Sequence, residues 1–421
     1  MTSRNRRSFM ATVGAAGTLG LAGCLSTIEG WRGADDEQSG GQLDGGADDE
    51  SEDLDLPGES VARFEELDPW VSMIDAGSLE AATNDPYAGA QSARLTAGED
   101  TEYAGIYTTA TDGLDLREQN LSLAVNFTGR EQILLTLELF APNAQHAHRM
   151  RRTLTGPTDR WVRVDFGTNQ IDGQPDLADV REIRVSVHRR GDHSGPIDCQ
   201  VDDLRAVDRP DGGKVMLLFD GTLESHYTNA LEHMQTYGYA GVEAVIPEAV
   251  GETRDGRLTL NMLSELDDAG WDMAARPRTG ANFIHEYSPD QQADLIERTN
   301  VSLERWGFED GAKHFITPRN VLGPETIDLV REHYEQAFRY GGGPNGLALT
   351  DPHNVGTFSG TAGSETKTYV DYAATHGQLA VVRFEEIDDD GFDERAFADL
   401  LAYIDDQDVA VVTATDLLEG A

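Results

Sequence analysis

The sequence predicts an antiparallel β-sandwich followed by an α/β barrel, and three observations support this order. Between residues 61 and 210, short runs alternate between apolar and polar residues and are broken by Gly, Asp and Asn, which is typical of antiparallel strands. From residue 211 to 421, near-continuous apolar strands alternate with amphipathic helical stretches, which indicates a parallel sheet covered on both faces. A chain of 421 residues is also too long for one ordinary domain.

Within the predicted sandwich, five segments alternate most clearly. They are residues 121–127, 133–140, 161–166, 183–187 and 197–204. This strand pattern and its closing segment resemble the jelly-roll carbohydrate-binding modules that flank secreted carbohydrate enzymes. The resemblance implies sugar binding, although a sandwich without a ligand is an equally open alternative. Four aromatic residues are candidates for stacking on sugars, but each is predicted to belong to the core or the rim: Trp70, Tyr87, Tyr103 and Tyr107.

The predicted barrel has seven parallel strands. They are residues 215–219, 241–246, 272–276, 314–317, 346–350, 379–385 and 409–413. Helices are expected over residues 225–237, 260–268, 324–340 and 394–405. In barrels of this kind, functional residues gather at the carboxyl ends of the strands.

Charged and polar residues stand at those strand ends. Asp220 follows the first strand, Glu243 lies within the second and Arg276 ends the third. The remaining positions are Pro318 and Arg319 after the fourth strand, Asp351 after the fifth and Glu385 after the sixth. We therefore expect the site at this end of the barrel, with Asp220, Glu385 and Asp351 as candidate catalytic carboxylates. Arg276, Pro318 and Arg319 are the candidate substrate-binding residues.

Three segments resemble the opening of the NodB-homology, or polysaccharide deacetylase, family. They are Val215 to Tyr227, which contains Leu-Phe-Asp-Gly-Thr, the segment Gly256 to Leu260, and Leu266 to Met273. The resemblance covers about 200 residues and implies a metal-dependent hydrolase of N-acetyl groups. In such an enzyme one Asp and two His hold a divalent metal, usually zinc, while a neighbouring Asp activates water and a late His protonates the leaving amine.

The sequence departs from that pattern at each metal ligand. Asp220 keeps the position of the general base, whereas Gly221 stands at the position of the ligand Asp. Arg276 and Gly280 fall in the motif that supplies both ligand histidines, and Glu385 stands where the late His is expected. Glycine has no side-chain donor and arginine stays protonated, so no metal ligands and no cofactor are predicted, although the family implies zinc.

Two predictions follow for the residues around the lost metal position. Arg276 is expected to face Asp220 and Glu385, so that an ion pair replaces coordination. His226, five residues after Gly221, is interpreted as facing the first helix rather than as a substitute ligand.

The amino terminus has the parts of an export signal. Residues 1–24 contain Arg6-Arg7, a short apolar stretch and Leu-Ala-Gly-Cys, which resembles a lipobox. We expect export by the twin-arginine route, lipidation of Cys24 and attachment to the outer face of the cytoplasmic membrane. Residues 25–60 are mostly Gly, Asp, Glu and Ser and are predicted to be an acidic disordered tether. Cys199 then remains as a lone, buried thiol.

The net charge of −43 is spread along the chain. Repulsion of this size is tolerated when salt screens it, which favours a halophilic source. Nucleic acid is excluded as a partner because the sequence has no basic patch.

Three functions remain open from the sequence. The first is a degenerate deacetylase, a pseudoenzyme that binds a polysaccharide or other glycan at the cell surface. The second is an active deacetylase or another carbohydrate hydrolase with displaced residues, and the third is a structural envelope protein. The absence of all three metal ligands is the feature that distinguishes the first function. Binding is favoured over catalysis because two units that resemble carbohydrate modules share one exported chain.

Overall fold

The computed structural model describes residues 54–129, 132–191, 195–388 and 392–420. Cys24 and residues 25–53 of the predicted tether lie outside the described residues. No helix in these ranges is both long enough and apolar enough to cross a membrane.

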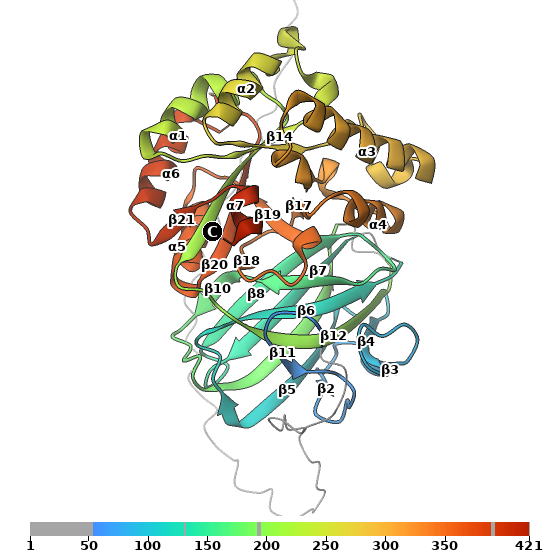
Figure 1. Cartoon of the computed structure of the whole chain (residues 1–421). Coiled ribbons are helices and arrows are strands. Elements are labelled where there is room, and N and C mark those ends of the chain that lie inside the picture. Colours follow the sequence, from blue (N-terminus) through green and yellow to red (C-terminus); the bar gives the residue numbers. More distant parts are fainter. Residues whose placement is uncertain (1–53, 130–131, 192–194, 389–391, 421) are drawn as a thin grey trace, which may run out of the picture. The chain divides into compact units, whose positions relative to one another are not determined.

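Two antiparallel sheets form the first part of the structure, and they share one apolar core. The first sheet consists of β1 (Glu59–Ala62), β3 (Ser78–Ala82), β4 (Ser92–Ala97), β6 (Gln119–Phe127), β9 (Val162–Phe166) and β12 (Ile197–Asp208). The second consists of β2 (Val71–Ser72), β5 (Tyr103–Leu114), β7 (Gln132–Phe140), β8 (Ala147–Thr155), β10 (Thr168–Asp172) and β11 (Val180–Arg189). The predicted antiparallel strands are therefore confirmed (Figure 1).

Two side chains show how the interior of these sheets is filled. Trp70 is buried and packs on Phe64 with ring centroids 5.0 Å apart, so it belongs to the core and is not a platform for sugars. Cys199 is a buried free thiol on β12, as expected. Burial raises the pKa of this thiol well above its usual value, so the thiol stays protonated and unreactive.

Seven parallel strands close into the predicted barrel, because the first and the last strands of the ring also pair with each other. In order around the ring they are β13 (Gly213–Asp220), β14 (Val242–Val245), β15 (Asp272–Ala275), β16 (His314–Ile316), β17 (Gln336–Tyr340), β19 (Val355–Ser359) and β20 (Gln378–Phe384). Two short strands lie outside the ring: β18 (Asn345–Gly346) runs antiparallel to β20, and β21 (Val409–Val411) runs parallel to the beginning of β13.

Helices cover the outer side of the strands (Figure 1). They are α1 (Leu231–Tyr237), α2 (Leu260–Asp268), α3 (Pro289–Trp306), α4 (Pro324–His333), α5 (Ser364–His376) and α6 (Glu394–Asp405). The last helix, α7 (Ala414–Glu419), instead packs Ala414 and Leu417 against the apolar core inside the barrel. Capping side chains explain where α2 and α6 begin. The Thr259 side chain accepts the Met262 N–H at the start of α2, and Asp393 accepts two backbone N–H groups at the start of α6.

The number of barrel strands was predicted correctly, but two of the predicted members were wrong. The predicted helix over residues 324–340 ends at His333, and its last residues form β17. The predicted strand over residues 346–350 is largely a bend, and the fifth position of the ring belongs to β17 while the sixth belongs to β19. The predicted strand over residues 409–413 is β21, which is not a member of the closed ring.

Buried polar contacts join the two sheets to the barrel on one side. The segment between β17 and β19 contains no α-helix. Arg339 on β17 extends outward and donates to two backbone oxygens. One belongs to Thr155, the last residue of β8, and the other to Gly156, which follows it. Arg152 on β8 donates to the Asn345 side chain at 2.7 Å. These contacts place the end of β8 against the outer side of β17.

Candidate functional site

Asp220 is held between two arginine side chains at the carboxyl end of the barrel. Its Oδ1 lies 2.5 Å from Arg276 Nε, and its Oδ2 lies 2.6 Å from Arg383 Nη2. The Asp220 side chain is 4% exposed, against 17% for Arg276 and 13% for Arg383. The expected ion pair between Arg276 and Asp220 is therefore present, and Arg383 is a second partner that we did not predict.

These three side chains share one side of the sheet, because residues two apart on a strand point the same way. Leu218 on β13, Ala274 on β15 and Val381 on β20 belong to the apolar core inside the barrel. Asp220, Arg276 and Arg383 each stand two residues further along the same strand or its extension. They therefore form a charged layer on top of the apolar interior, and we name this group the Asp220 clamp.

Glu385 lies at the end of β20, next to the clamp. Arg383 Nη2 donates to Glu385 Oε1 at 3.0 Å, so the same nitrogen serves both carboxylates. The Glu385 side chain is 76% exposed, in contrast to that of Asp220. An open pocket at this point is lined by Ser359, Gly360, Arg383, Phe384, Glu385, Glu386 and Phe392. Glu385 thus forms a solvated edge of the clamp.

A buried ion pair lies on the outer face of β14, on the side away from the apolar interior of the barrel. His226 begins a π-helical turn (His226–Ala230) before α1, and its Nδ1 lies 2.8 Å from Glu243 Oε2 of β14. Its Nε2 faces the backbone oxygen of Glu385. With Glu243 ionised, both ring nitrogens face acceptors and donate to them, and the ring is an imidazolium ion. Burial raises the pKa of Glu243, while the charge of His226 and the hydrogen bond to it lower that pKa. His226 therefore points at the strands, and neither of its nitrogens has a lone pair for a metal.

The electrostatic balance of this pair favours the charged histidine. Burial by itself lowers the pKa of His226, but the adjacent Glu243 carboxylate and the two hydrogen bonds outweigh burial, so the pKa is raised. A raised pKa in the folded state stabilises the protein fully below the unfolded value of about 6.5, and this stabilisation is lost as the pH rises through the folded pKa.

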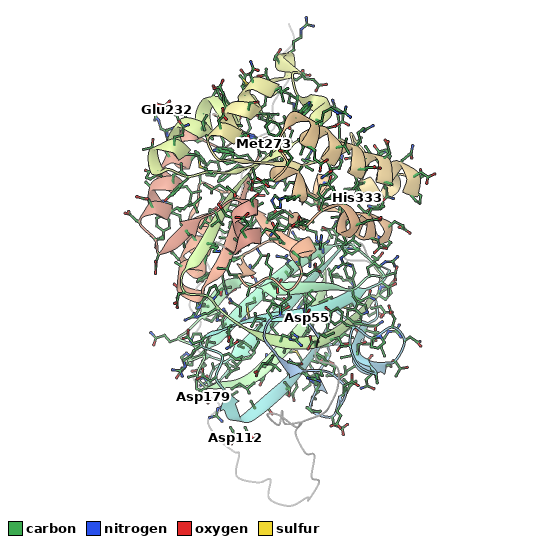
Figure 2. All side chains as sticks on the ribbon, in the orientation of Figure 1. Asp55, Asp112, Asp179, Glu232, Met273 and His333 are labelled. Atoms are coloured by element: carbon green, nitrogen blue, oxygen red, sulfur yellow. The ribbon has the colours of Figure 1, made fainter. Side chains whose placement is uncertain are left out.

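We expect the double substitution His226→Gln and Glu243→Gln to flatten the pH dependence of stability above the unfolded histidine pKa of about 6.5. In the unaltered protein, the folded state binds one more proton than the unfolded state in this range. The free energy of unfolding therefore falls by up to about 1.4 kcal/mol for each unit by which the pH rises. Denaturation midpoints at fixed high salt measure this slope. The control is His333→Gln on α4, which should keep the original slope (Figure 2). An unchanged slope in the double variant would contradict the charged pair.

Histidines with lowered pKa values do not contribute to the slope of stability against pH that this experiment measures. Burial lowers the pKa of His148 to about 3 and the pKa of His314 to about 4. Such groups cost stability only where the unfolded chain binds a proton that the folded chain does not, which is below about pH 6.5.

Pro318 and Arg319 follow β16 and stand at the expected end of the barrel. Pro318 is buried, whereas Arg319 is exposed and has a positive φ of 55°. The Arg319 guanidinium donates to Ala281 O at 2.8 Å and lies 4.8 Å from the centre of the Phe283 ring. This residue braces the loop after β15, and its proposed contact with substrate stays a prediction.

The predicted position of Asp351 is wrong. Asp351 precedes β19 and caps a short 3₁₀ turn (Pro352–Asn354), which places it at the amino ends of the strands. Its Oδ2 accepts the backbone N–H of Arg163 on β9 at 3.0 Å and pairs with Arg331 of α4 at 3.3 Å. Asp351 therefore lies at the opposite end of the barrel from Asp220 and belongs to the contact with the sheets. The error follows from the misplaced fifth strand.

The clamp does not fit the zinc that the family resemblance implies. The described residues contain no group of three His, Cys, Asp or Glu side chains arranged to hold a metal. Asp220, the one carboxylate at the position, has a guanidinium cation on each oxygen. At two of the three lost ligand positions, Gly221 has a φ of 125° and Gly280 a φ of 57°, which side chains rarely adopt. The backbone as well as the side chains thus differs from a metal cage.

Sequence reasoning missed the pairing roles of Arg383, Glu243 and His226. One signal was available for Arg383: it interrupts the apolar strand Gln378–Phe384 at a position that shares the inward parity of Leu379 and Val381. A charge at an inward position of a buried strand needs a partner of opposite charge. Its identity as Asp220 required the closed ring.

A scan against protein-family models and a search of curated proteins gave no match. Among solved structures, similar chains include the Xyl-CE4 domain of a multidomain xylanase from the hindgut metagenome of Trinervitermes trinervoides, with a TM-score of 0.38 and 15% identity over 50% of this chain and 91% of that chain. A family 4 acetyl xylan esterase from Clostridium thermocellum in complex with a cobalt ion has a TM-score of 0.37 and 15% identity over 49% and 92%. The peptidoglycan deacetylase PdaC from Bacillus subtilis has a TM-score of 0.35 and 15% identity over 50% and 92%. Family 4 carbohydrate esterases and polysaccharide deacetylases are thus among the structural neighbours of the carboxy-terminal half of this chain.

Proposed function

We propose that this protein binds a glycan at the cell surface through the carboxyl end of its barrel and does not hydrolyse it. The observation that carries the proposal is the Asp220 clamp. Both Asp220 oxygens contact guanidinium nitrogens, at 2.5 and 2.6 Å, so the carboxylate is already neutralised by two cations and is a weak base for an attacking water. Arg276 and Arg383 fill the space above the barrel core that a metal-bound water would need.

The site retains features suited to holding a sugar. The pocket beside the clamp combines charged donors on Arg383 with the ring of Phe392. Aromatic rings and fixed polar groups are the usual means of orienting a ligand in a concave site. The same groups supply no general base together with a nucleophile, so they support binding more than turnover.

A hydrolase that uses carboxylates is the second candidate. Asp220 and Glu385 contact the same nitrogen of Arg383, at 2.6 and 3.0 Å, so their nearest oxygens lie within about 6 Å. Carboxylates about 5–5.5 Å apart serve retaining glycosidases. The arginine between them occupies the position where the scissile bond would lie, which is why we rank this candidate second.

The proposed location follows from the amino terminus. Arg6-Arg7 and the lipobox-like Leu-Ala-Gly-Cys support export by the twin-arginine route and a lipid on Cys24. Such an anchor would hold the protein on the outer face of the cytoplasmic membrane, within reach of surface glycans. Cell fractionation of the Cys24→Ser protein, which should leave the membrane fraction, checks this anchor.

The proposed function is tested on the full exported protein, purified in 1 M KCl. We expect less than 0.1 zinc per chain after incubation with Zn²⁺ and removal of excess metal, because the clamp repels a cation. We also expect no acetate from an N-acetylated chitooligosaccharide, together with saturable binding of surface glycan prepared from the same cells. Stoichiometric zinc with turnover, or absence of any glycan binding, would overturn the proposal.

A further inference from the structure

The clamp has an unequal number of positive and negative charges. Two guanidinium groups, Arg276 and Arg383, share the single buried carboxylate of Asp220. The nearby His226 and Glu243 form a pair that cancels its own charge. The second carboxylate that Arg383 contacts, Glu385, is the one that is mostly in solvent. The positive charge that Asp220 does not balance is therefore balanced only by an exposed carboxylate.

Glu385 is held less firmly than Asp220. Its side chain is 76% exposed and makes its charged contact with Arg383 at 3.0 Å, whereas Asp220 is 4% exposed and contacts two arginines. Exposed ion pairs contribute about 0–1 kcal/mol, so turning Glu385 into solvent costs little. Arg383 Nε is also buried and has no hydrogen-bond partner among the described residues. The guanidinium group is thus incompletely satisfied within the protein.

We infer that the ligand is an acidic glycan, whose carboxylate or sulfate group takes the place of Glu385 on Arg383. This inference rests on the proposed function. A planar guanidinium group binds both anions through parallel N–H donors, and such charge-assisted bonds are stronger than bonds to neutral hydroxyls. A neutral sugar would displace Glu385 without replacing its charge. An acidic sugar restores the balance of the layer and can rest its ring on Phe392, which lines the same pocket.

The net charge of −43 does not oppose this binding in the salt that such a protein requires. At 1 M salt the Debye length is about 3 Å, so long-range repulsion between the chain and a polyanion is screened. A contact pair in a partly buried pocket is screened much less. The affinity for an acidic glycan should therefore persist at high salt, which distinguishes it from nonspecific attraction.

The test compares three tetrasaccharides on the full exported protein by calorimetry in 1 M KCl: tetragalacturonate, a sulfated carrageenan tetrasaccharide and neutral cellotetraose. We expect at least tenfold tighter binding of one or both acidic sugars than of the neutral one. Whichever acidic sugar binds more tightly shows whether the site prefers a carboxylate or a sulfate group. Glu385→Gln should raise the affinity for that sugar three- to tenfold, because the internal competitor is removed. Arg383→Gln should lower it at least tenfold, while Asp220 keeps Arg276.

The matched control is Glu232→Gln, which removes the same charge from the outer side of α1 and should leave affinity unchanged (Figure 2). Equal binding of the neutral and acidic sugars would overturn this inference and leave the proposed function standing. Binding of the acidic sugars with no gain in Glu385→Gln would also overturn it. Failure of all three tetrasaccharides together with native surface glycan would overturn the proposed function itself.

Discussion

Replacing Asp203 by Asn is expected to lower the free energy of unfolding by about 3–5 kcal/mol, the usual cost of leaving a buried charge without its partner. Asp203 Oδ2 pairs with Arg163 at 2.9 Å and with Arg205 at 2.7 Å. All three side chains are at most 3% exposed. The amide keeps the shape and tolerates the positive φ of 40° at this position, so the change isolates the charge.

The same strand offers a matched control for this experiment. Asp198 on β12 pairs with Arg94 at 2.5 Å, but the two side chains are 25% and 43% exposed. Asp198→Asn should cost less than about 1 kcal/mol, as exposed pairs do. Unfolding in guanidinium chloride, which keeps ionic strength high, measures both variants. Equal losses in the two variants would show that burial of the Asp203 pairs is not what makes them matter.

Replacing Asp220 by Asn should also destabilise the protein, by about 2–3 kcal/mol, because two guanidinium groups would then lie together without their anion. The value is below that for Asp203 because Arg276 and Arg383 are 17% and 13% exposed and keep some water. The prediction separates two roles for Asp220. In an active enzyme, removing a strained catalytic carboxylate is often neutral or stabilising. In the clamp, the carboxylate holds the structure together.

A double variant gives the control for Asp220. Asp220→Asn with Arg276→Gln removes one cation together with the carboxylate, so about half of the lost stability should return. Guanidinium chloride midpoints of the two variants provide the comparison. A stable Asp220→Asn protein, or a double variant worse than the single one, would contradict a structural role for the charge.

Local patterns determined much of the fold before any contact was known. The strands over residues 215–219 and 197–204 lie within β13 and β12, and the helices over residues 260–268 and 394–405 match α2 and α6. Their apolar periodicity and their first-turn capping residues are properties of neighbouring residues. Such signals do not depend on contacts with distant parts of the chain.

The end of α4 shows where local patterns fail. Ile327, Val330, Tyr334 and Ala337 keep the spacing of a helical face, so the periodicity extends beyond His333. In the structure, residues 336–340 pair with β16 and β19 and become the fifth strand of the ring. Backbone hydrogen bonds to distant strands outweighed the helical pattern, and this one error moved Asp351 to the wrong end of the barrel.

The sequence by itself determined that positions 221, 276 and 280, where the family resemblance expects metal ligands, carry glycine, arginine and glycine, none of which offers a side-chain donor to a cation. It also placed Asp220, Arg276 and Glu385 at one end of the barrel. Only the tertiary structure decided what Asp220 binds. Its partners come from the ends of strands more than 50 and 160 residues away. Coulombic contact depends on distances in space, and closing the ring through β13 and β20 sets those distances.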